Sequence, residues 1–347
     1  MLVIIRQQGD LRMPISQNST PQAWIRRGLL CAALMPMAIL GPGEGANAQE
    51  TFPSKNISLL VAYPPGGGAD RLARLLAQGL SERLGRQVVV ENKPGGSGAV
   101  VFGELRQRNA DSHTLAIATE AGVTVMPLTT KGLGYDALKD FVLLSQVTEV
   151  PLLIAAPPGG TIGDASALFK AGHDRPGAVN MGIISLANQI AFQELKAISS
   201  VDFNLVTYRG EADVAIALMG NQLDAGLLTL AGARPLVQAG KLVPLAVTGR
   251  SRLPSMPDVP RVSEFAPGLD LRAWIGVFVR AGAPPTHLER LEKELATVVR
   301  TYGPLIEFFR SNDYPVIGIG SSEATAVWRA DYDSTARSLN KLGIKPQ

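Results

Sequence analysis

The chain has 347 residues, a formal net charge of +3 and only 18% charged residues. Its 33 Lys and Arg residues form no basic run, which excludes a nucleic-acid-binding protein, because such proteins gather basic residues on one face. An aromatic content of 5% argues against an aromatic-lined groove for sugars or single-stranded nucleic acid. The length is sufficient for one large domain or two ordinary domains with a substantial core.

The first segment has the order of residues that is typical of a secretory signal peptide. Two consecutive arginines precede the apolar run at 28–40, and Ala46 and Ala48 follow with A-x-A spacing. The apolar run is short for a membrane span, so residues 1–48 are predicted to be cleaved from a periplasmic protein. Cys31 is the only cysteine and lies in this segment, so the mature chain is expected to have no disulfide, thiol nucleophile or thiolate metal site.

A glycine-rich loop joins the first predicted strand to the first predicted helix. The strand is ISLLVAY at 57–63, and the loop PPGGG follows it at 64–68. Asp70 is predicted to cap the helix by accepting hydrogen bonds from its free N–H groups. Leucines between residues 72 and 84 recur on one helical face, and Gly85 is predicted to end the helix.

The alternation of strand and helix patterns continues along the chain. Further strands are predicted at 87–92, 113–119, 151–157, 178–184, 203–208, 224–230, 242–249 and 273–279. The first three strands, with a helix after each of the first two, predict a parallel sheet with helices on both faces. The pattern after the last strand is mostly helical.

The order of these elements predicts an α/β protein with two lobes. The proline-rich segment 250–268 is predicted to be a connecting surface segment. The chain is expected to cross between the lobes near residue 150 and to return near residue 270. Residues 49–149 and 271–347 then form lobe 1, residues 150–270 form lobe 2, and the two crossings form a hinge beside a cleft.

The glycine loop has the properties of an anion site without a cationic side chain. A glycine-rich turn exposes backbone N–H groups, and the positive end of the helix dipole lies beneath them. The sequence GGGADR lacks the third glycine of a dinucleotide loop, and Asp70, near the helix start, would repel phosphate. A small carboxylate, or a tight turn without a ligand, are the two interpretations that remain open.

Catalytic patterns are absent from the sequence. Nothing in the pattern places His113, His173 and His287 together, and neither H-E-x-x-H nor G-x-S-x-G occurs. The acidic residues of DYD at 331–333 are predicted to form a solvated helix face rather than a metal site. We therefore predict no enzyme, no metal and no cofactor, and a loop that binds its ligand without reacting.

Five sequence blocks in order resemble the Bug-type substrate-binding receptors of tripartite tricarboxylate transporters. The resemblance extends over residues 52–346. The blocks are YPPGGGADRLARLLAQGLSERLGRQVVVENKPGGSG (63–98), LGYDALKDFVLLSQV (133–147), VTYRGEADVAIALMGNQLDAGLL (206–228), AGKLVPLAVTGRSRLPSMPDVPRVSEFAPG (239–268) and WIGVFVRAGAP (274–284).

The resemblance implies a two-lobed type II periplasmic-binding-protein fold, with a small carboxylic acid in the cleft between the lobes. It also implies delivery of that acid to a membrane permease, and the receptor itself is expected to be a monomer. The carboxylate is held largely by backbone N–H groups and bridging waters in such receptors. The predicted ligand-binding residues are Tyr63, Pro64, Pro65, Gly66, Gly67, Gly68, Asp70 and Thr119 in lobe 1, and Ser185, Asn188, Gln189, Tyr208 and Thr229 in lobe 2.

The second-lobe turn departs from the family pattern G-S-x-G-x-G-S-x-x-H. In MGIISLANQ at 181–189 the glycines after Gly182 and the histidine are missing, which leaves Ser185, Asn188 and Gln189 as polar candidates. Since none of the three carries a charge, a monocarboxylate, or an acid with one neutral polar end, is expected over citrate-like tricarboxylates. The alternative is that Asn188 caps the following helix and Ser185 bonds its own turn.

Two other functions remain open on the sequence alone. An exported α/β enzyme would need a clustered nucleophile or base. An orphan binding protein that reports its ligand to a membrane sensor would have the same sequence features as a transport receptor.

Overall fold

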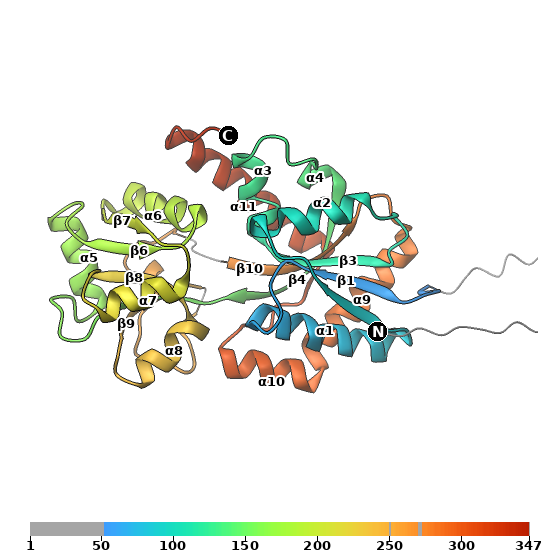
Figure 1. The fold of residues 1–347 in the computed structure, drawn as a ribbon, viewed down its shortest axis with the longest axis horizontal. Helices are drawn as coiled ribbons and strands as arrows, with labels where there is room; N and C mark the ends of the chain where they lie inside the picture. The colour runs from blue at the N-terminus through green and yellow to red at the C-terminus, as the bar shows by residue number, and fades with distance from the viewer. Residues whose placement is uncertain (1–51, 250, 270–272, 347) are drawn as a thin grey trace, which may run out of the picture. The chain divides into compact units, whose positions relative to one another are not determined.

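The computed structural model describes residues 52–249, 251–269 and 273–346, and the predicted signal peptide 1–48 lies outside these ranges. Two β-sheets divide the described chain (Figure 1). We call the six-stranded sheet with its helices lobe 1, and the five-stranded sheet with its helices lobe 2. Among the described residues, no helix combines the length and apolarity needed to cross a membrane.

The elements of lobe 1 come from both ends of the described chain. They are β1 (Ile57–Val61), α1 (Gly68–Leu84), β2 (Val88–Asn92), η1 (Gly96–Gly98), α2 (Ala99–Gln107), β3 (Thr114–Thr119), η2 (Glu120–Gly122), α3 (Val125–Thr129), α4 (Ala137–Asp140), β4 (Phe141–Val150), β10 (Ala273–Arg280), α9 (Pro285–Thr301), α10 (Gly303–Asn312), β11 (Ile319–Gly320) and α11 (Ser321–Lys341).

The elements of lobe 2 are continuous in sequence. They are β5 (Leu152–Ala156), α5 (Ala165–Asp174), β6 (Asn180–Ile183), α6 (Leu186–Ser199), β7 (Asn204–Thr207), α7 (Glu211–Met219), β8 (Ala225–Thr229), α8 (Leu230–Gln238), β9 (Val243–Val247) and η3 (Val262–Glu264). The strands predicted from the apolar runs are therefore confirmed, with ends that differ by a few residues.

The sheet of lobe 1 has the strand order β11-β4-β10-β3-β1-β2. β1 pairs in parallel with β2 and β3, as predicted. β10 is antiparallel to both β3 and β4, so the sheet as a whole is mixed. β4 was not predicted because it is not a simple apolar run: its buried residues include Ser145, Gln146, Thr148 and Glu149.

Helices cover both faces of this sheet, as predicted. Ile57, Leu59 and Val61 of β1 pack in one hydrophobic cluster with α1, α9 and α10. Leu60 and the residues beside it pack in a second cluster with α2 and α11. Successive residues of a strand point to opposite faces, so a strand covered on both faces is apolar throughout. Figure 1 shows α1 and α2 on opposite sides of the strands.

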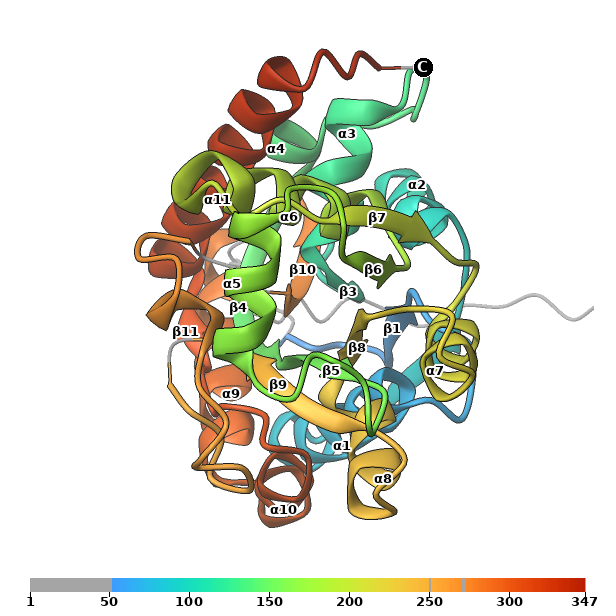
Figure 2. The same cartoon turned by 90° about the vertical axis from the view of Figure 1, so that its left-hand side faces the viewer.

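The sheet of lobe 2 has the strand order β7-β6-β8-β5-β9. β6 is parallel to β7 and β8, and β5 is antiparallel to β8 and β9. Buried residues of α5 and α6 cover one face of the sheet, and buried residues of α7 and α8 cover the other. Figure 2 shows the strands of this sheet between α6 and α8.

Candidate functional site

The strand registers place the carboxyl ends of β3 and β8 at the junction of the two lobes. Thr119, the last residue of β3, pairs with Ile275 near the start of β10. Thr229, the last residue of β8, pairs with Leu152 at the start of β5. Only Pro151 separates β5 from β4, which pairs with β10 in lobe 1. The two predicted threonines therefore lie at facing edges of the two sheets, where ligands of open α/β sheets bind.

The glycine loop offers backbone N–H donors at the start of α1. Gly66 has φ +91°, a left-handed conformation that glycine adopts without strain, and the chain enters the helix at Gly68. The N–H groups of Gly67, Gly68 and Ala69 have no acceptor among the described residues. Residues 64–68 are exposed. Three free donors at the positive end of a 17-residue helix are of the kind that bind anions.

Asp70 does not cap α1, and that prediction is wrong. The cap position is Gly67, and Asp70 lies inside the first turn with an exposure of 3%. Its carboxylate reaches back to accept the Gly66 N–H at 2.9 Å. It also accepts hydrogen bonds from Arg74 Nε at 2.9 Å and Asn92 Nδ2 at 2.7 Å. Asp70 therefore fixes the shape of the loop and uses the Gly66 N–H that the sequence assigned to the ligand.

The charge of Asp70 is held by these donors. Burial opposes ionisation, but the hydrogen bonds from Arg74, Gly66 and Asn92 outweigh it and lower the pKa of Asp70 to about 2. The positive charge of Arg74 and the other donors partly neutralise the Asp70 carboxylate, which reduces its repulsion of a bound anion. The loop can therefore bind a carboxylate through the N–H groups that Asp70 leaves free.

Tyr63 connects the glycine loop to the end of β3. Its hydroxyl oxygen accepts the Thr119 N–H at 3.1 Å. Burial raises the pKa of Tyr63 to about 12, so the hydroxyl keeps its proton near neutral pH. The hydroxyl group interacts with both the backbone and the side chain of Thr119, and a hydroxyl can donate one hydrogen bond and accept two. Tyr63 is thus a candidate donor to a bound acid.

The facing edge of lobe 2 holds a carboxyl group that the sequence did not single out. Glu211, the first residue of α7, accepts hydrogen bonds at Oε1 from the Thr229 N–H at 2.9 Å and the Thr229 hydroxyl at 2.8 Å. Thr229 is also the N-cap of α8, where its hydroxyl oxygen accepts the Gly232 N–H at 3.2 Å. Burial raises the pKa of Glu211, and the two hydrogen bonds from Thr229 oppose that rise.

Tyr314 of lobe 1 lies within electrostatic range of both edges. It follows α10 and packs edge-on against Phe308 with the ring centroids 5.7 Å apart. Burial raises the pKa of Tyr314, and the charge of Glu211 raises it further. Tyr314 in turn contributes to the raised pKa of Tyr63.

The second-lobe turn bonds mainly within itself. Ser185 is the N-cap of α6, and its Oγ accepts the Asn188 N–H at 3.2 Å. The Asn188 side chain accepts the Ile184 N–H at 3.3 Å. The sequence left open, as the alternative, that both side chains bond locally, but it gave the cap to Asn188; in the structure Ser185 is the cap and Asn188 bonds back to the turn. The Ser185 hydroxyl hydrogen, the Asn188 amide donors and the half-buried Gln189 side chain are without acceptors in the described chain.

Tyr208 extends the pairing of β6 and β7, donating its N–H to the Ile183 carbonyl at 2.8 Å. Its side chain packs against the hydrophobic cluster under α7 and α8. It also lines a shallow surface hollow with Arg209 and Asp213. Tyr208 therefore lies on lobe 2 beside α7, and no contact of the described residues joins it to the glycine loop.

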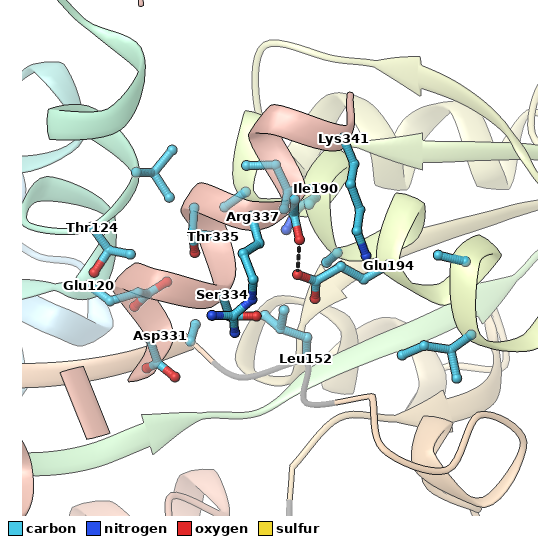
Figure 3. Close-up of a pocket in the computed structure, with 18 of the residues that line it drawn as sticks. Glu120, Thr124, Leu152, Ile190, Glu194, Asp331, Ser334, Thr335, Arg337 and Lys341 are labelled. Atoms are coloured by element: carbon cyan, nitrogen blue, oxygen red, sulfur yellow. Dashed lines mark hydrogen bonds between the residues drawn. The ribbon is translucent and has the colours of Figure 1, made fainter. Parts of the chain in front are cut away.

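A cavity of about 350 Å³ lies between α11 of lobe 1 and α6 of lobe 2 (Figure 3). Of the predicted ligand-binding residues, only Asn188 lines it. Asp331 lines it as well and accepts the Trp274 indole N–H at 2.7 Å, so the prediction that residues 331–333 form a solvated face is wrong for Asp331. Glu194 accepts a hydrogen bond from Ser338 across the lobes. The cavity therefore borders the candidate site, and the glycine loop lies outside it.

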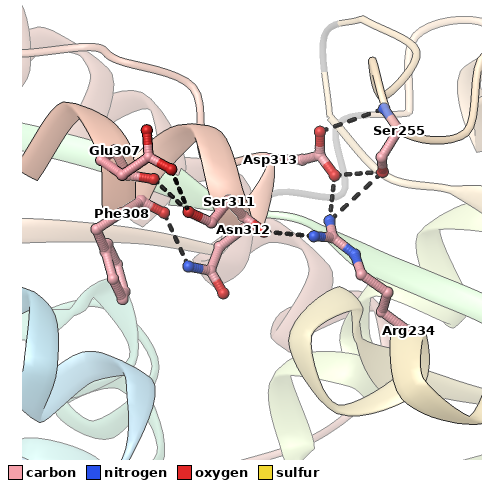
Figure 4. A network of polar contacts seen from close by, with 7 residues as sticks. All are labelled: Arg234, Ser255, Glu307, Phe308, Ser311, Asn312 and Asp313. Carbon is pink, nitrogen blue, oxygen red and sulfur yellow. Dashed lines mark hydrogen bonds and ion pairs between the residues drawn. The ribbon is translucent and has the colours of Figure 1, made fainter.

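A polar network joins the lobes at the end of α10 (Figure 4). Asp313 accepts hydrogen bonds from the Arg234 guanidinium of α8 and from the hydroxyl of Ser255. The Ser255 N–H donates to the same carboxylate at 3.3 Å, and Arg234 donates to the Ser311 carbonyl. Asp313 has φ +51°, so the chain leaves α10 in a left-handed conformation that points Asp313 away from the helix axis.

Two of the three histidines lie together, which the sequence pattern did not predict. His287 stacks on Phe52 with ring centroids 4.1 Å apart, and His113 meets the same ring edge-on at 5.0 Å. His113 precedes β3 and lies at the opposite end of that strand from Thr119. Within the described ranges, no group of three or more His, Cys, Asp or Glu side chains is placed to hold a metal ion.

Sequence reasoning missed Glu211 and Tyr314. Glu211 directly follows the Tyr-Arg-Gly segment at 208–210, and an acidic residue there was the one available signal. Tyr314 has no motif around it, because its position depends on where α10 ends.

Comparisons with known proteins agree with this fold. The family model described as tripartite tricarboxylate transporter family receptor matches residues 72–335. A protein of the tcbD–tcbE intergenic region of Pseudomonas sp. (strain P51) is 30% identical over 263 residues, covering 75% of this chain and 78% of that protein. Protein BugT of Bordetella pertussis (strain Tohama I) is 26% identical over 276 residues, covering 77% and 83%.

Solved structures show the same two-lobed architecture. A structure of a periplasmic transporter superposes with a TM-score of 0.71 at 28% identity, covering 85% of this chain and 99% of that chain. A protein of R. palustris with adipate has a TM-score of 0.71 at 25% identity, covering 85% of this chain and 100% of that chain.

Proposed function

Because the chain belongs to the tripartite tricarboxylate transporter receptor family, we propose that it is a periplasmic receptor that captures a small organic carboxylate and delivers it to a membrane permease. The family and the fold are those of solute-binding proteins. We also propose that residues 1–48 direct export and that the receptor is a monomer. We propose that residues 49–149 and 271–347 form one lobe and residues 150–270 the other.

One observation carries the proposal. The free N–H groups of Gly67, Gly68 and Ala69 stand at the N-terminus of α1, beside the lobe edge that holds Thr119. We assign the ligand carboxylate to these donors and to the Tyr63 hydroxyl. The adipate-bound relative supports a carboxylic acid as the ligand class. In lobe 2 we assign the far end of the ligand to Thr229, Ser185, Asn188 and Gln189, which favours an acid with one polar end over a tricarboxylate.

Gly67→Val tests this assignment directly. Gly67 has φ −77°, and a Cβ there meets no atom nearer than the Pro64 carbonyl at 4.0 Å, so valine fits the protein without strain. The valine methyl groups would instead occupy the space of the ligand. Loss of one or two charge-assisted hydrogen bonds weakens binding about tenfold or more.

The measurement is isothermal titration calorimetry with mono-, di- and tricarboxylates, with unfolding temperatures to confirm the fold. Gly163→Val is the matched control, because Gly163 is exposed in lobe 2 and a Cβ there meets nothing within 4 Å. A folded Gly67→Val protein with wild-type affinity would refute the anion site. Stronger stabilisation by citrate than by any monocarboxylate would refute the expected ligand class.

A further inference from the structure

The carboxyl group of Glu211 has no counter-ion within the described residues. Oε1 accepts both hydrogen bonds of this carboxyl group, from the N–H and the hydroxyl of Thr229, and Oε2 has no partner in the described part of the chain. Arg234, on the neighbouring helix α8, is bound to Asp313 instead. A partly buried carboxylate is stable only when it is paired or fully hydrogen-bonded. Glu211 therefore presents an unused acceptor at the lobe edge that faces the candidate site.

Burial raises the pKa of this carboxyl group, and the hydrogen bonds from Thr229 stabilise its charged form against that effect. The Thr229 hydroxyl and N–H both donate to it, and its Oε1 packs against the first turn of α8. A Cβ at Gly232 would collide with Glu211 Oε1, so the glycine is what admits the carboxylate to this position. The N-terminus of a helix stabilises a negative charge.

The position of Glu211 relates it to the ligand rather than to the lobe 2 interior. Its hydrogen-bond donor Thr229 ends β8 beside the hinge residue Leu152. Leu152 follows Pro151, which joins lobe 2 to β4 of lobe 1, so Thr229 and the carboxyl group bound to it lie at the junction of the lobes. A molecule held by its carboxylate at the glycine loop and extending toward lobe 2 would meet a negative wall at Glu211.

We propose that Glu211 binds the far end of the ligand and selects acids that carry an ammonium group or another strong hydrogen-bond donor there, in preference to dicarboxylates. The proposal rests on the proposed function, because it needs a carboxylate at the glycine loop. Glu211 Oε2 accepts from the donor group of the ligand, and Thr229 holds the carboxyl group in place. The ligand class is then an amino acid whose amino group is distant from its carboxylate.

The test compares pairs of ligands with equal chain lengths. The pairs are 4-aminobutanoate with succinate, 5-aminopentanoate with glutarate and 6-aminohexanoate with adipate, and hexanoate is the singly charged reference. For the length that fits, calorimetry should show the wild-type protein binding the amino acid at least about tenfold more tightly than the diacid. Glu211→Gln should remove this preference while hexanoate binding stays within about twofold.

Two further variants separate charge from position. Asp213→Asn makes the same charge change two residues along α7, where the side chain is exposed, and should leave the preference unchanged. Gly232→Ala keeps the charge of Glu211 but displaces its carboxylate, and should weaken binding of the amino acid alone. If the wild-type and Glu211→Gln proteins prefer the diacid equally, this inference is overturned. The proposed function still stands in that case if the wild-type protein binds hexanoate and Gly67→Val weakens that binding. Failure of every panel compound to bind the wild-type protein overturns both.

Discussion

The network around Asp313 is expected to stabilise the contact between the lobes. Asp313→Asn removes the negative charge that pairs with Arg234. It also places the asparagine NH₂ group, a donor, against the Arg234 and Ser255 groups that donate to the carboxylate. The side chains of Asp313 and Arg234 are only 5% and 19% exposed, so water cannot replace the lost partner efficiently. Arg234 Nε is already buried without an acceptor. Leaving one partner of such a pair unmatched costs about 2–4 kcal/mol of the free energy of unfolding.

For a chain of this size, about 1 kcal/mol changes the unfolding temperature by about 2 °C, so Asp313→Asn should lower it by about 4–8 °C. The assay is urea unfolding followed by tryptophan fluorescence, with calorimetry for the unfolding temperature. Arg310→Gln is the control, because Arg310 and Glu307 form an ion pair on the same helix with 77% and 60% exposure. An exposed pair contributes less than about 1 kcal/mol.

The double variant Arg234→Met/Asp313→Asn measures the coupling between the two side chains. Because methionine keeps the apolar stem of Arg234 and removes the unmatched charge, the double variant should recover part of the stability lost in Asp313→Asn. Destabilisation by Asp313→Asn no greater than that by Arg310→Gln would refute the reasoning.

Two further predictions concern the pH dependence and the mature N-terminus. The pKa of Asp70 is lowered from 3.8 to about 2, so its hydrogen bonds contribute fully above pH 4 and their contribution, up to about 2 kcal/mol, is lost as the pH falls toward 2. Asp70→Asn should therefore flatten acid unfolding between pH 4 and 2 while lowering stability at pH 7, and an unchanged acid profile would contradict the assignment. Sequencing of protein from the periplasmic fraction should begin near Gln49, and an intact N-terminal segment in the membrane fraction would show that 1–48 is not cleaved.

The hydropathy pattern predicted the strands that have mainly apolar residues on both faces. β1 and β3 are buried on both sides over most of their length and are mainly apolar; β1 has one half-buried serine, Ser58, and β3 has a threonine at each end. β4 is equally buried, but it contains polar residues. The hydroxyls of Ser145 and Thr148 donate hydrogen bonds to the carbonyls of Ile319 and Pro315 at 2.9 and 2.8 Å. Those acceptors lie in a segment about 170 residues later in the chain. A buried polar residue whose hydrogen-bond partner is distant in sequence looks like an exposed residue in the hydropathy pattern. That pattern therefore does not predict a buried strand at β4.

The same limit applies to the candidate site. The glycine loop was predictable because a tight turn before a helix has a local requirement for glycine. The role of Asp70 was not predictable, because one of its donors, Asn92, is 22 residues away in the sequence and only the fold brings the two side chains together. The Ser185 turn is the opposite case. Both its hydrogen bonds are local, so local bonding by Ser185 and Asn188 was predictable from the sequence, although the cap is Ser185 and not Asn188.

The end of α10 acts on lobe 2 through two consecutive residues. Asp313 binds Arg234 in the middle of α8, and Tyr314 experiences the charge of Glu211, whose carboxylate packs on the first turn of the same helix. The ion pair is made by a residue of α8, and the carboxylate of Glu211 lies against the first turn of that helix. A ligand changes the balance between lobe arrangements only through contacts that differ between them. A shift of α8 relative to α10 alters both contacts at once, so the network at Asp313 and the proposed selectivity at Glu211 are expected to be coupled even though Arg234 touches no ligand.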